Sequence, residues 1–235
     1  MNTNAKLART AGLLYLIVVA AGIFSLGYVP SQTVVPGDAA ATWTKIASSE
    51  TLFRLGIGAS GVCYVAFLLL PLALYRLLSQ VNKSAAVLMV AFAAVSVPIS
   101  LANLSNKLEV LSLLSGADYL RAFTAEQLQA QAMLSLDAYN KGIWVAKIFW
   151  GLWLLPFGYL VFRSGLLPRI LGLLLMAGCF GYLIDFCGRV LFPGYPDTAL
   201  ARFVILPATI GEIGSCLWLL VMGARESKKT VADPV

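Results

Sequence analysis

The sequence has no histidine and few charges. Of its 235 residues, 12% are Asp, Glu, Lys or Arg, about half of the share usual in a soluble domain. The missing histidine excludes histidine-ligated haem or metal, Ser–His triads and Cys–His dyads. Because 60% of the residues are hydrophobic, the composition also excludes a soluble enzyme and a disordered chain. We therefore predict a membrane protein with no cofactor and no metal site.

The four cysteines lie inside apolar runs, and no two of them form a CxxC pair. Their spacing supports neither a redox motif nor a thiolate zinc site. We predict that all four are small buried hydrophobic side chains. They are Cys63, Cys179, Cys187 and Cys216.

Six apolar stretches are long enough for a membrane-spanning helix, which needs about 20 residues. The stretches are continuous rather than alternating, which indicates helices. We predict a single transmembrane domain over residues 1–235, an all-α bundle of six transmembrane helices. The expected spans are 11–29, 55–75, 85–106, 142–162, 170–192 and 203–223.

Basic residues gather on one side of this topology. That side carries nine Lys or Arg and two acidic residues, whereas the other carries six basic and seven acidic residues. The positive-inside rule then places both termini in the cytoplasm. The net charge of +6 is thus explained by membrane-flanking residues, and we predict no nucleic-acid partner. The nine basic residues are Lys6, Arg9, Arg76, Lys83, Arg163, Arg169, Arg225, Lys228 and Lys229.

Two segments in the outer loops have the pattern of short amphipathic helices. Asp38 is the expected cap of a helix over 39–47. Residues 124–127 form a capping-box pattern, and apolar residues follow it at helical spacing. We expect both helices to lie on the outer membrane interface. The alternative is that they act as lids over an outward cavity.

Ionisable residues inside the spans are candidates for a functional site, because a charge in the membrane is costly. Glu212 lies ten residues after Arg202 and thirteen before Arg225, which is about 15 and 20 Å along a helix. It should therefore sit near the membrane midplane. The candidate ligand- or ion-binding residues are Arg54, Lys147, Asp185, Arg189 and Glu212.

Apart from Glu212, these charges fall in the outer half of the membrane. Charges of both signs should converge on the bundle interior, since a lipid-facing charge is expensive. We therefore expect a polar pocket that opens to the outside. The alternative is structural: Asp185 and Arg189 would form only an ion pair one helical turn apart, and Lys147 would snorkel outward or pair with Glu212 or Asp185.

Two pairs of small residues favour close packing of spans five and six. The pairs are Ala177 with Gly181 and Gly211 with Ser215. Pro207 should kink span six, five residues before Glu212. We expect Asp185 and Glu212 to point into the bundle from these two helices.

Short motifs along nearly the whole chain carry a family resemblance. They occupy residues 8–15 (ARTAGLLY), 34–40 (VVPGDAA), 49–54 (SETLFR), 72–78 (LALYRLL), 207–212 (PATIGE) and 217–220 (LWLL). With these motifs the chain resembles an uncharacterised bacterial family of six-helix membrane proteins, domain of unknown function family 4386. The resemblance implies a location in the bacterial inner membrane and implies no activity. It places Arg54 and Glu212 in family-like motifs, which favours them as site residues.

Three functions agree with these features, and whether the protein is an enzyme stays open. We rank first the binding or transport of a small polar or amphipathic ligand, such as a lipid headgroup, with Glu212 as a proton or cation site. The second is a structural or accessory subunit whose charges pair internally or with a membrane partner or a second copy. The third is a lipid-modifying enzyme with Glu212 or Asp185 as general base and with Lys147 and Arg189 holding an anionic group. In every case the lipid bilayer is a partner.

Overall fold

A computed structural model describes residues 3–223, and this part of the chain consists of helices and connecting turns, with no strand. Six helical stretches are long and apolar enough to cross a membrane, so the predicted number of spans is confirmed. They cover Ala5–Thr33, Glu50–Leu78, Lys83–Leu114, Ala125–Ser164, Arg169–Leu191 and Ala199–Val221. The basic residues Arg225, Lys228 and Lys229 lie outside the described residues.

The described chain divides into two compact units. The first consists of residues 3–16, 69–93 and 150–223, and the second of residues 17–68 and 94–149. Each unit therefore combines segments that lie far apart in the sequence. The single domain over residues 1–235 stays a prediction.

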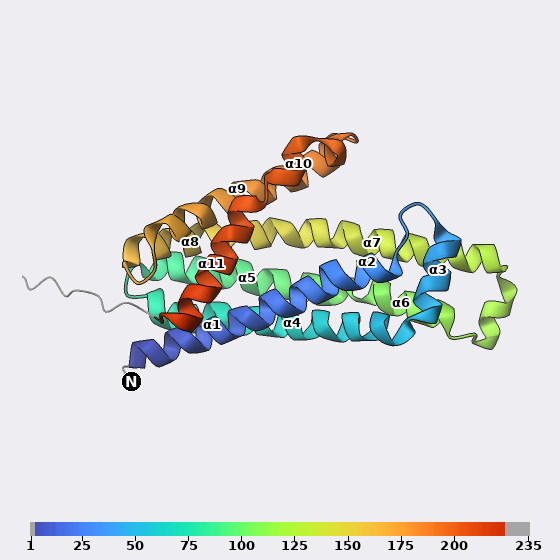
Figure 1. Cartoon of the computed structure of the whole chain (residues 1–235), viewed down its shortest axis with the longest axis horizontal. Helices are drawn as coiled ribbons and strands as arrows, with labels where there is room; N and C mark the ends of the chain where they lie inside the picture. Colours follow the sequence, from blue (N-terminus) through green and yellow to red (C-terminus); the bar gives the residue numbers. More distant parts are fainter. Residues whose placement is uncertain (1–2, 224–235) are drawn as a thin grey trace, which may run out of the picture. The chain divides into compact units, whose positions relative to one another are not determined.

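In the first unit α9 packs against both α8 and α11 (Figure 1). The unit also contains the segments of α1, α4 and α5 within its residues. The turn between α8 and α9 contains Gly165, whose φ of 67° favours glycine. Gly158 and Gly172 face each other across these two helices, where a Cβ on either would lie 2.6 Å from the other's carbonyl oxygen. The helices that lie wholly or partly in this unit are α1 (Thr3–Gly22), α4 (Glu50–Leu78), α5 (Lys83–Asn103), α8 (Leu154–Ser164), α9 (Arg169–Leu191), η3 (Tyr195–Asp197), α10 (Ala199–Phe203) and α11 (Leu206–Val221).

Small residues bring α9 and α11 together, as the sequence indicates. A Cβ on Gly178 would lie 2.6 Å from the Cα of Ala208, and one on Gly181 would overlap the carbonyl oxygen of Val204. Gly211 contributes from α11, where a Cβ would lie 3.1 Å from the backbone nitrogen of Leu175. The glycine that joins Gly181 in the contact is Gly178 rather than the predicted Ala177, which is exposed.

The contact at Gly178 gives a testable prediction. Gly178→Ala should lower the free energy of unfolding by about 1–3 kcal/mol, because the new methyl group meets the backbone of α11 and forces the two helices apart. Thermal unfolding of the purified protein in detergent measures the loss. The matched control is Gly58→Ala in α4, where a Cβ meets nothing within 4 Å. A Gly178→Ala protein that melts at or above the wild-type temperature contradicts the prediction.

Pro207 lies in the first turn of α11, where its missing N–H leaves no helical hydrogen bond unmade. The bend predicted for span six is therefore a break between α10, which ends at Phe203, and α11, which begins at Leu206. Glu212 follows in the second turn of α11. The proline thus starts the helix that carries the candidate carboxylate.

The second unit has a hydrophobic core of its own, in which α3 packs on its longer helices. Buried members of this core are Ile46, Phe53, Val110, Ala132 and Leu136. They come from α3, α4, α6 and α7, so the short helix is tied to three others. The helices of this unit are η1 (Ile23–Tyr28, a π-helix), α2 (Val29–Thr33), α3 (Ala39–Ser48), α6 (Ser105–Leu114), η2 (Asp118–Ala122) and nearly all of α7 (Ala125–Leu152), with parts of α1, α4 and α5.

Both predicted helix caps are present. Asp38 Oδ1 accepts a hydrogen bond from the backbone N–H of Ala41 at 2.8 Å, so α3 begins where the sequence places it. Thr124 Oγ1 accepts from the N–H of Gln127 at 3.3 Å, and Gln127 Oε1 accepts from the N–H of Thr124 at 2.9 Å. The second amphipathic segment is not a separate helix, however, because it runs on into the span as the first half of α7.

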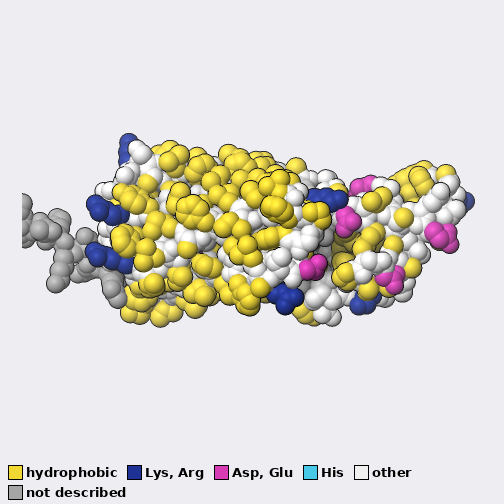
Figure 2. All heavy atoms as spheres, turned by 90° about the horizontal axis from the view of Figure 1, so that it is seen from above, with side chains coloured by type: hydrophobic (Ala, Val, Ile, Leu, Met, Phe, Trp, Pro, Cys, Tyr) yellow, Lys and Arg dark blue, Asp and Glu magenta, His cyan; other side chains and the backbone are white. Residues whose placement is uncertain are grey.

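Large hydrophobic side chains are exposed along the helices, and they cover most of the face shown in Figure 2. A soluble monomer rarely exposes apolar patches of this extent, whereas lipid-facing helices do. Three of the four cysteines are buried, as predicted, but Cys187 is exposed. It lies two residues after the buried Asp185 on α9, and residues two apart point to different faces of a helix.

Candidate functional site

Glu212 is held by two tyrosines from two other helices of the first unit. Its Oε1 accepts a hydrogen bond from the Tyr15 hydroxyl of α1 at 3.3 Å, and its Oε2 accepts from the Tyr182 hydroxyl of α9 at 3.4 Å. An ionised carboxylate can only accept hydrogen bonds. The two hydroxyls therefore fix the orientation of the carboxylate and stabilise its charged form.

Glycines position both tyrosines. Gly12 lies one turn before Tyr15, and a Cβ on it would lie 2.6 Å from the backbone nitrogen of Leu220, so α1 and α11 touch through their backbones. The Cys216 thiol donates to the Gly12 carbonyl oxygen at 3.8 Å in the same contact. On the other side, a Cβ on Gly151 would lie 2.8 Å from Cβ of Tyr182. Larger residues at these glycines would displace the tyrosines from Glu212.

An aromatic wall stands behind Tyr15. The rings of Trp153 and Phe157 are stacked, with centroids 5.1 Å apart and planes 7° apart. The Tyr15 ring is tilted against both, at 6.2 and 6.4 Å between centroids. All three side chains are fully buried. The wall holds the Tyr15 ring in place and excludes water from that side of the carboxylate, which strengthens electrostatic interactions there.

Asp185 and Arg189 form the ion pair that their spacing on α9 predicts. Arg189 Nε lies 3.0 Å from Asp185 Oδ1, and the Asp185 side chain is completely buried. Asp185 is three residues from Tyr182, so both lie on the same face of α9. The structure thus brings Asp185, Arg189 and Glu212 into one unit, with Tyr182 on the helix of the ion pair and in contact with Glu212.

Tyr195 lies close enough to this ion pair to feel both of its charges, a proximity that the sequence does not indicate. Its ring packs where a Cβ on Gly188 would otherwise lie, in the last turns of α9. Burial raises the pKa of the Tyr195 hydroxyl, the Asp185 carboxylate raises it further, and Arg189 acts in the opposite direction. The only signal in the sequence is a turn sequence, Gly-Tyr-Pro-Asp, a few residues after the helix. Such turns are common, so the position of Tyr195 near the ion pair could not be inferred from it.

The other two predicted site residues belong to the second unit. Arg54 Nε pairs with Glu50 Oε1 at 2.6 Å on the surface of α4, with 58% and 42% of the two side chains exposed. This is a solvated i,i+4 pair of the kind that contributes little to stability. Lys147 is half-buried on α7. Three of the five predicted residues, Asp185, Arg189 and Glu212, therefore lie in the first unit.

The second unit also has an open groove of about 480 Å³ that the sequence did not indicate. One carboxylate and two amides line it, and Gln131 Nε2 donates to Glu109 Oε1 across it at 3.4 Å. Its walls are otherwise apolar, and none of the five predicted site residues is among them. The lining residues are Glu109, Leu113, Phe123, Gln127, Leu128, Ala130, Gln131 and Leu134.

Six apolar spans and a half-buried carboxylate held between three helices define a multi-pass helical membrane protein. Residues 10–223 match the model of the family described as Domain of unknown function (DUF4386), and the chain belongs to this family, as its motifs predict. The chain is 32% identical over 99 residues to an uncharacterized protein of Archaeoglobus fulgidus. That match covers 42% of this chain and 56% of the archaeal protein, little more than half of its length. No solved structure matches the chain.

Proposed function

We propose that this protein binds a small polar or amphipathic ligand within the membrane, and that Glu212 takes up a cation: a proton or the cationic group of the ligand. The observation that carries the proposal is the electrostatics around Glu212. Two tyrosine hydroxyls orient its carboxylate, and within the described part of the first unit no Lys or Arg forms an ion pair with it. A negative charge without a fixed counterion inside a span attracts a cation.

The neighbouring ion pair supports this assignment. Asp185 and Arg189 neutralise each other at 3.0 Å. The charge that a ligand meets is therefore that of Glu212. Binding is the first step of transport, and charged groups in membrane spans commonly mark substrate or ion pathways.

The two alternative functions make different demands on these residues. Catalysis by a pair of carboxylates is disfavoured, because Asp185 is already engaged by Arg189. An accessory subunit would use Glu212 to contact a partner's helix and would bind no small cation. A titration with organic cations separates this alternative from ligand binding.

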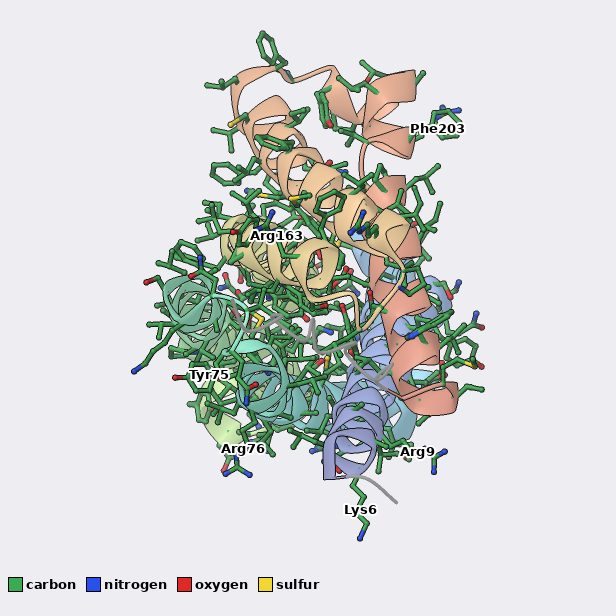
Figure 3. The ribbon with its side chains drawn as sticks, turned by 90° about the vertical axis from the view of Figure 1, so that its left-hand side faces the viewer. Lys6, Arg9, Tyr75, Arg76, Arg163 and Phe203 are labelled. Atoms are coloured by element: carbon green, nitrogen blue, oxygen red, sulfur yellow. The ribbon has the colours of Figure 1, made fainter. Side chains whose placement is uncertain are left out.

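We also propose that both termini lie in the cytoplasm and that the protein resides in the bacterial inner membrane. The first unit supports this orientation. Arg76 lies in the last turn of α4 and Arg163 in the last turn of α8. Figure 3 shows Lys6 of α1 and Arg76 projecting outward at the end of this unit that faces the viewer, where Arg163 also lies. They form the basic flank that the positive-inside rule assigns to the cytoplasm.

The proposal is tested by titrating the purified full-length protein in a neutral detergent with choline and with dodecyltrimethylammonium. Glu212→Gln should weaken the binding of at least one of these cations tenfold or more, because the amide has the shape of the carboxylate but no charge. Calorimetry measures the affinity, and the infrared carboxyl band that the substitution removes reports proton uptake. The matched control is Glu126→Gln at the exposed start of α7, with an affinity within twofold of the wild type.

Two results contradict the proposal. One is equal cation affinity in the wild type and in Glu212→Gln. The other is a wild-type protein that binds neither cation and shows no protonation change at Glu212 between mildly acidic and mildly alkaline pH. The second result would favour the accessory-subunit alternative.

A further inference from the structure

Lys107, in the second unit, is a buried lysine without a carboxylate partner. It lies on α6, and only 3% of it is exposed. Its Nζ lies 4.1 Å from the centroid of the Tyr139 ring on α7. Among residues 3–223, no Asp or Glu forms an ion pair with Lys107, and no side chain or carbonyl accepts a hydrogen bond from its ammonium group. The sequence places Lys107 at the end of span three and gives it no role.

The Tyr139 ring compensates only part of the cost of burying this charge. An ammonium group carries three N–H donors and no acceptor. Removing such an ion from water is costly in a protein interior. A cation–π contact that is shielded from water returns only part of this cost. The part of the burial cost that the ring does not compensate favours the binding of an anion next to the Lys107 ammonium group.

Hydrogen bonds hold the surroundings of Lys107 in place. Asn103 Nδ2 donates to the Tyr139 carbonyl oxygen at 2.8 Å, which ties the end of α5 to α7. Asn106 Nδ2 donates to Asn103 Oδ1 at 2.9 Å. Glycine at 142 leaves room for the Asn103 side chain, which a Cβ there would overlap. The position of Lys107 against Tyr139 is therefore preorganised, and each group that fixes it is neutral.

We propose that Lys107 is an anion-binding site that holds a carboxylate or phosphate group. Lysine acts as a compact point charge, which suits a single anionic oxygen. The anionic group comes either from an acidic lipid headgroup or from a free anion. Lys107 lies seven residues from the end of its span at Leu114, roughly 10 Å along the helix, a depth that a lipid headgroup reaches. This site is separate from the cation site at Glu212, and neither depends on the other.

The test measures anion affinity of the full-length protein in a neutral detergent by calorimetry and by the shift in melting temperature. The probes are inorganic phosphate, acetate, and mixed micelles of phosphatidylglycerol, each compared with chloride or phosphatidylcholine at equal ionic strength. Lys107→Met should weaken the binding of at least one anionic probe tenfold or more. Lys107→Gln provides a second variant, with a polar side chain, in case the methionine variant does not fold. A response to phosphatidylglycerol alone identifies a lipid headgroup, and a response to phosphate or acetate identifies a free anion.

The matched control is Lys141→Met, which removes an exposed lysine of α7 two residues from Tyr139. It should keep the wild-type anion affinity within twofold.

Two results overturn the proposal. In the first, the Lys107 variants bind as the wild type does, or the control weakens equally, which means that the anions associate with the basic surface. In the second, no anionic probe binds the wild type better than its neutral or chloride reference, and Lys107→Met melts at or above the wild-type temperature, which makes Lys107 a packing residue.

Discussion

Replacing Asp185 by leucine should lower the free energy of unfolding by about 3–5 kcal/mol, the loss typical when one partner of a buried ion pair is removed. The Asp185 side chain is completely buried, and Arg189 Nε lies 3.0 Å from it with 23% of the arginine side chain exposed. The substitution takes away the carboxylate that compensates the guanidinium group. Thermal unfolding of the purified protein in detergent measures the loss.

Two controls separate this effect from a general sensitivity of the fold. The double variant Asp185→Leu/Arg189→Met should recover most of the stability, because replacing a whole buried pair by hydrophobic side chains is commonly neutral or favourable. Glu50→Gln removes the partner of Arg54 in an exposed pair and should change the free energy of unfolding by at most about 1 kcal/mol. An Asp185→Leu protein as stable as the wild type would mean that the pair contributes nothing.

The spans and the ion pair were predictable because each depends on local sequence. A span is recognisable from about 20 apolar residues, since lipid accepts only helices in which every backbone group is satisfied. Asp185 and Arg189 are four residues apart on one helix, a spacing that brings two side chains together wherever the helix lies. The caps at Asp38 and Thr124 are local in the same sense.

The partners of Glu212 were not predictable in this way. Tyr15 lies 197 residues from Glu212 in the sequence, and a tyrosine in an apolar stretch is unremarkable. The contact depends on the relative rotation of three helices, which backbone contacts at Gly12 and Gly178 determine. A glycine in a span signals that two helices can approach closely, but it does not say which helix approaches.

The burial of Lys107 was also not predictable from the sequence. The span predicted from the sequence ends at Asn106, which makes Lys107 a flanking charge at the membrane surface. The helical span instead continues to Leu114, and Lys107 is buried.

The effect of a proline on its helix was not predictable from the sequence either. Pro207 starts a helix, whereas Pro30 follows the π-helical turn of η1. Since Pro30 has no N–H to give to residue 26, the preceding turn changes its hydrogen-bond register.

Removing the hydroxyls of Tyr15 and Tyr182 should lower the free energy of unfolding, because Glu212 loses both of its hydrogen-bond donors. The double variant Tyr15→Phe/Tyr182→Phe deletes the two donors while keeping both rings. A hydrogen bond to a charged group contributes about 1.5–3 kcal/mol. The two bonds are 3.3 and 3.4 Å long, which places them at the weak end, so we expect a loss of about 3 kcal/mol in the free energy of unfolding. Thermal unfolding measures it, and Tyr28→Phe/Tyr119→Phe, at two exposed tyrosines, is the control.

A third substitution assigns the loss to the carboxylate. Adding Glu212→Leu to the double variant removes the group that needs the hydroxyls, so most of the lost stability should return. The coupling between the three positions is then the stabilisation that the hydroxyls give to Glu212. If the triple variant is no more stable than the double variant, the hydroxyls act through packing against the wall of Trp153 and Phe157. Glu212 would then be oriented by its own helix, and the cation site would need no tyrosine.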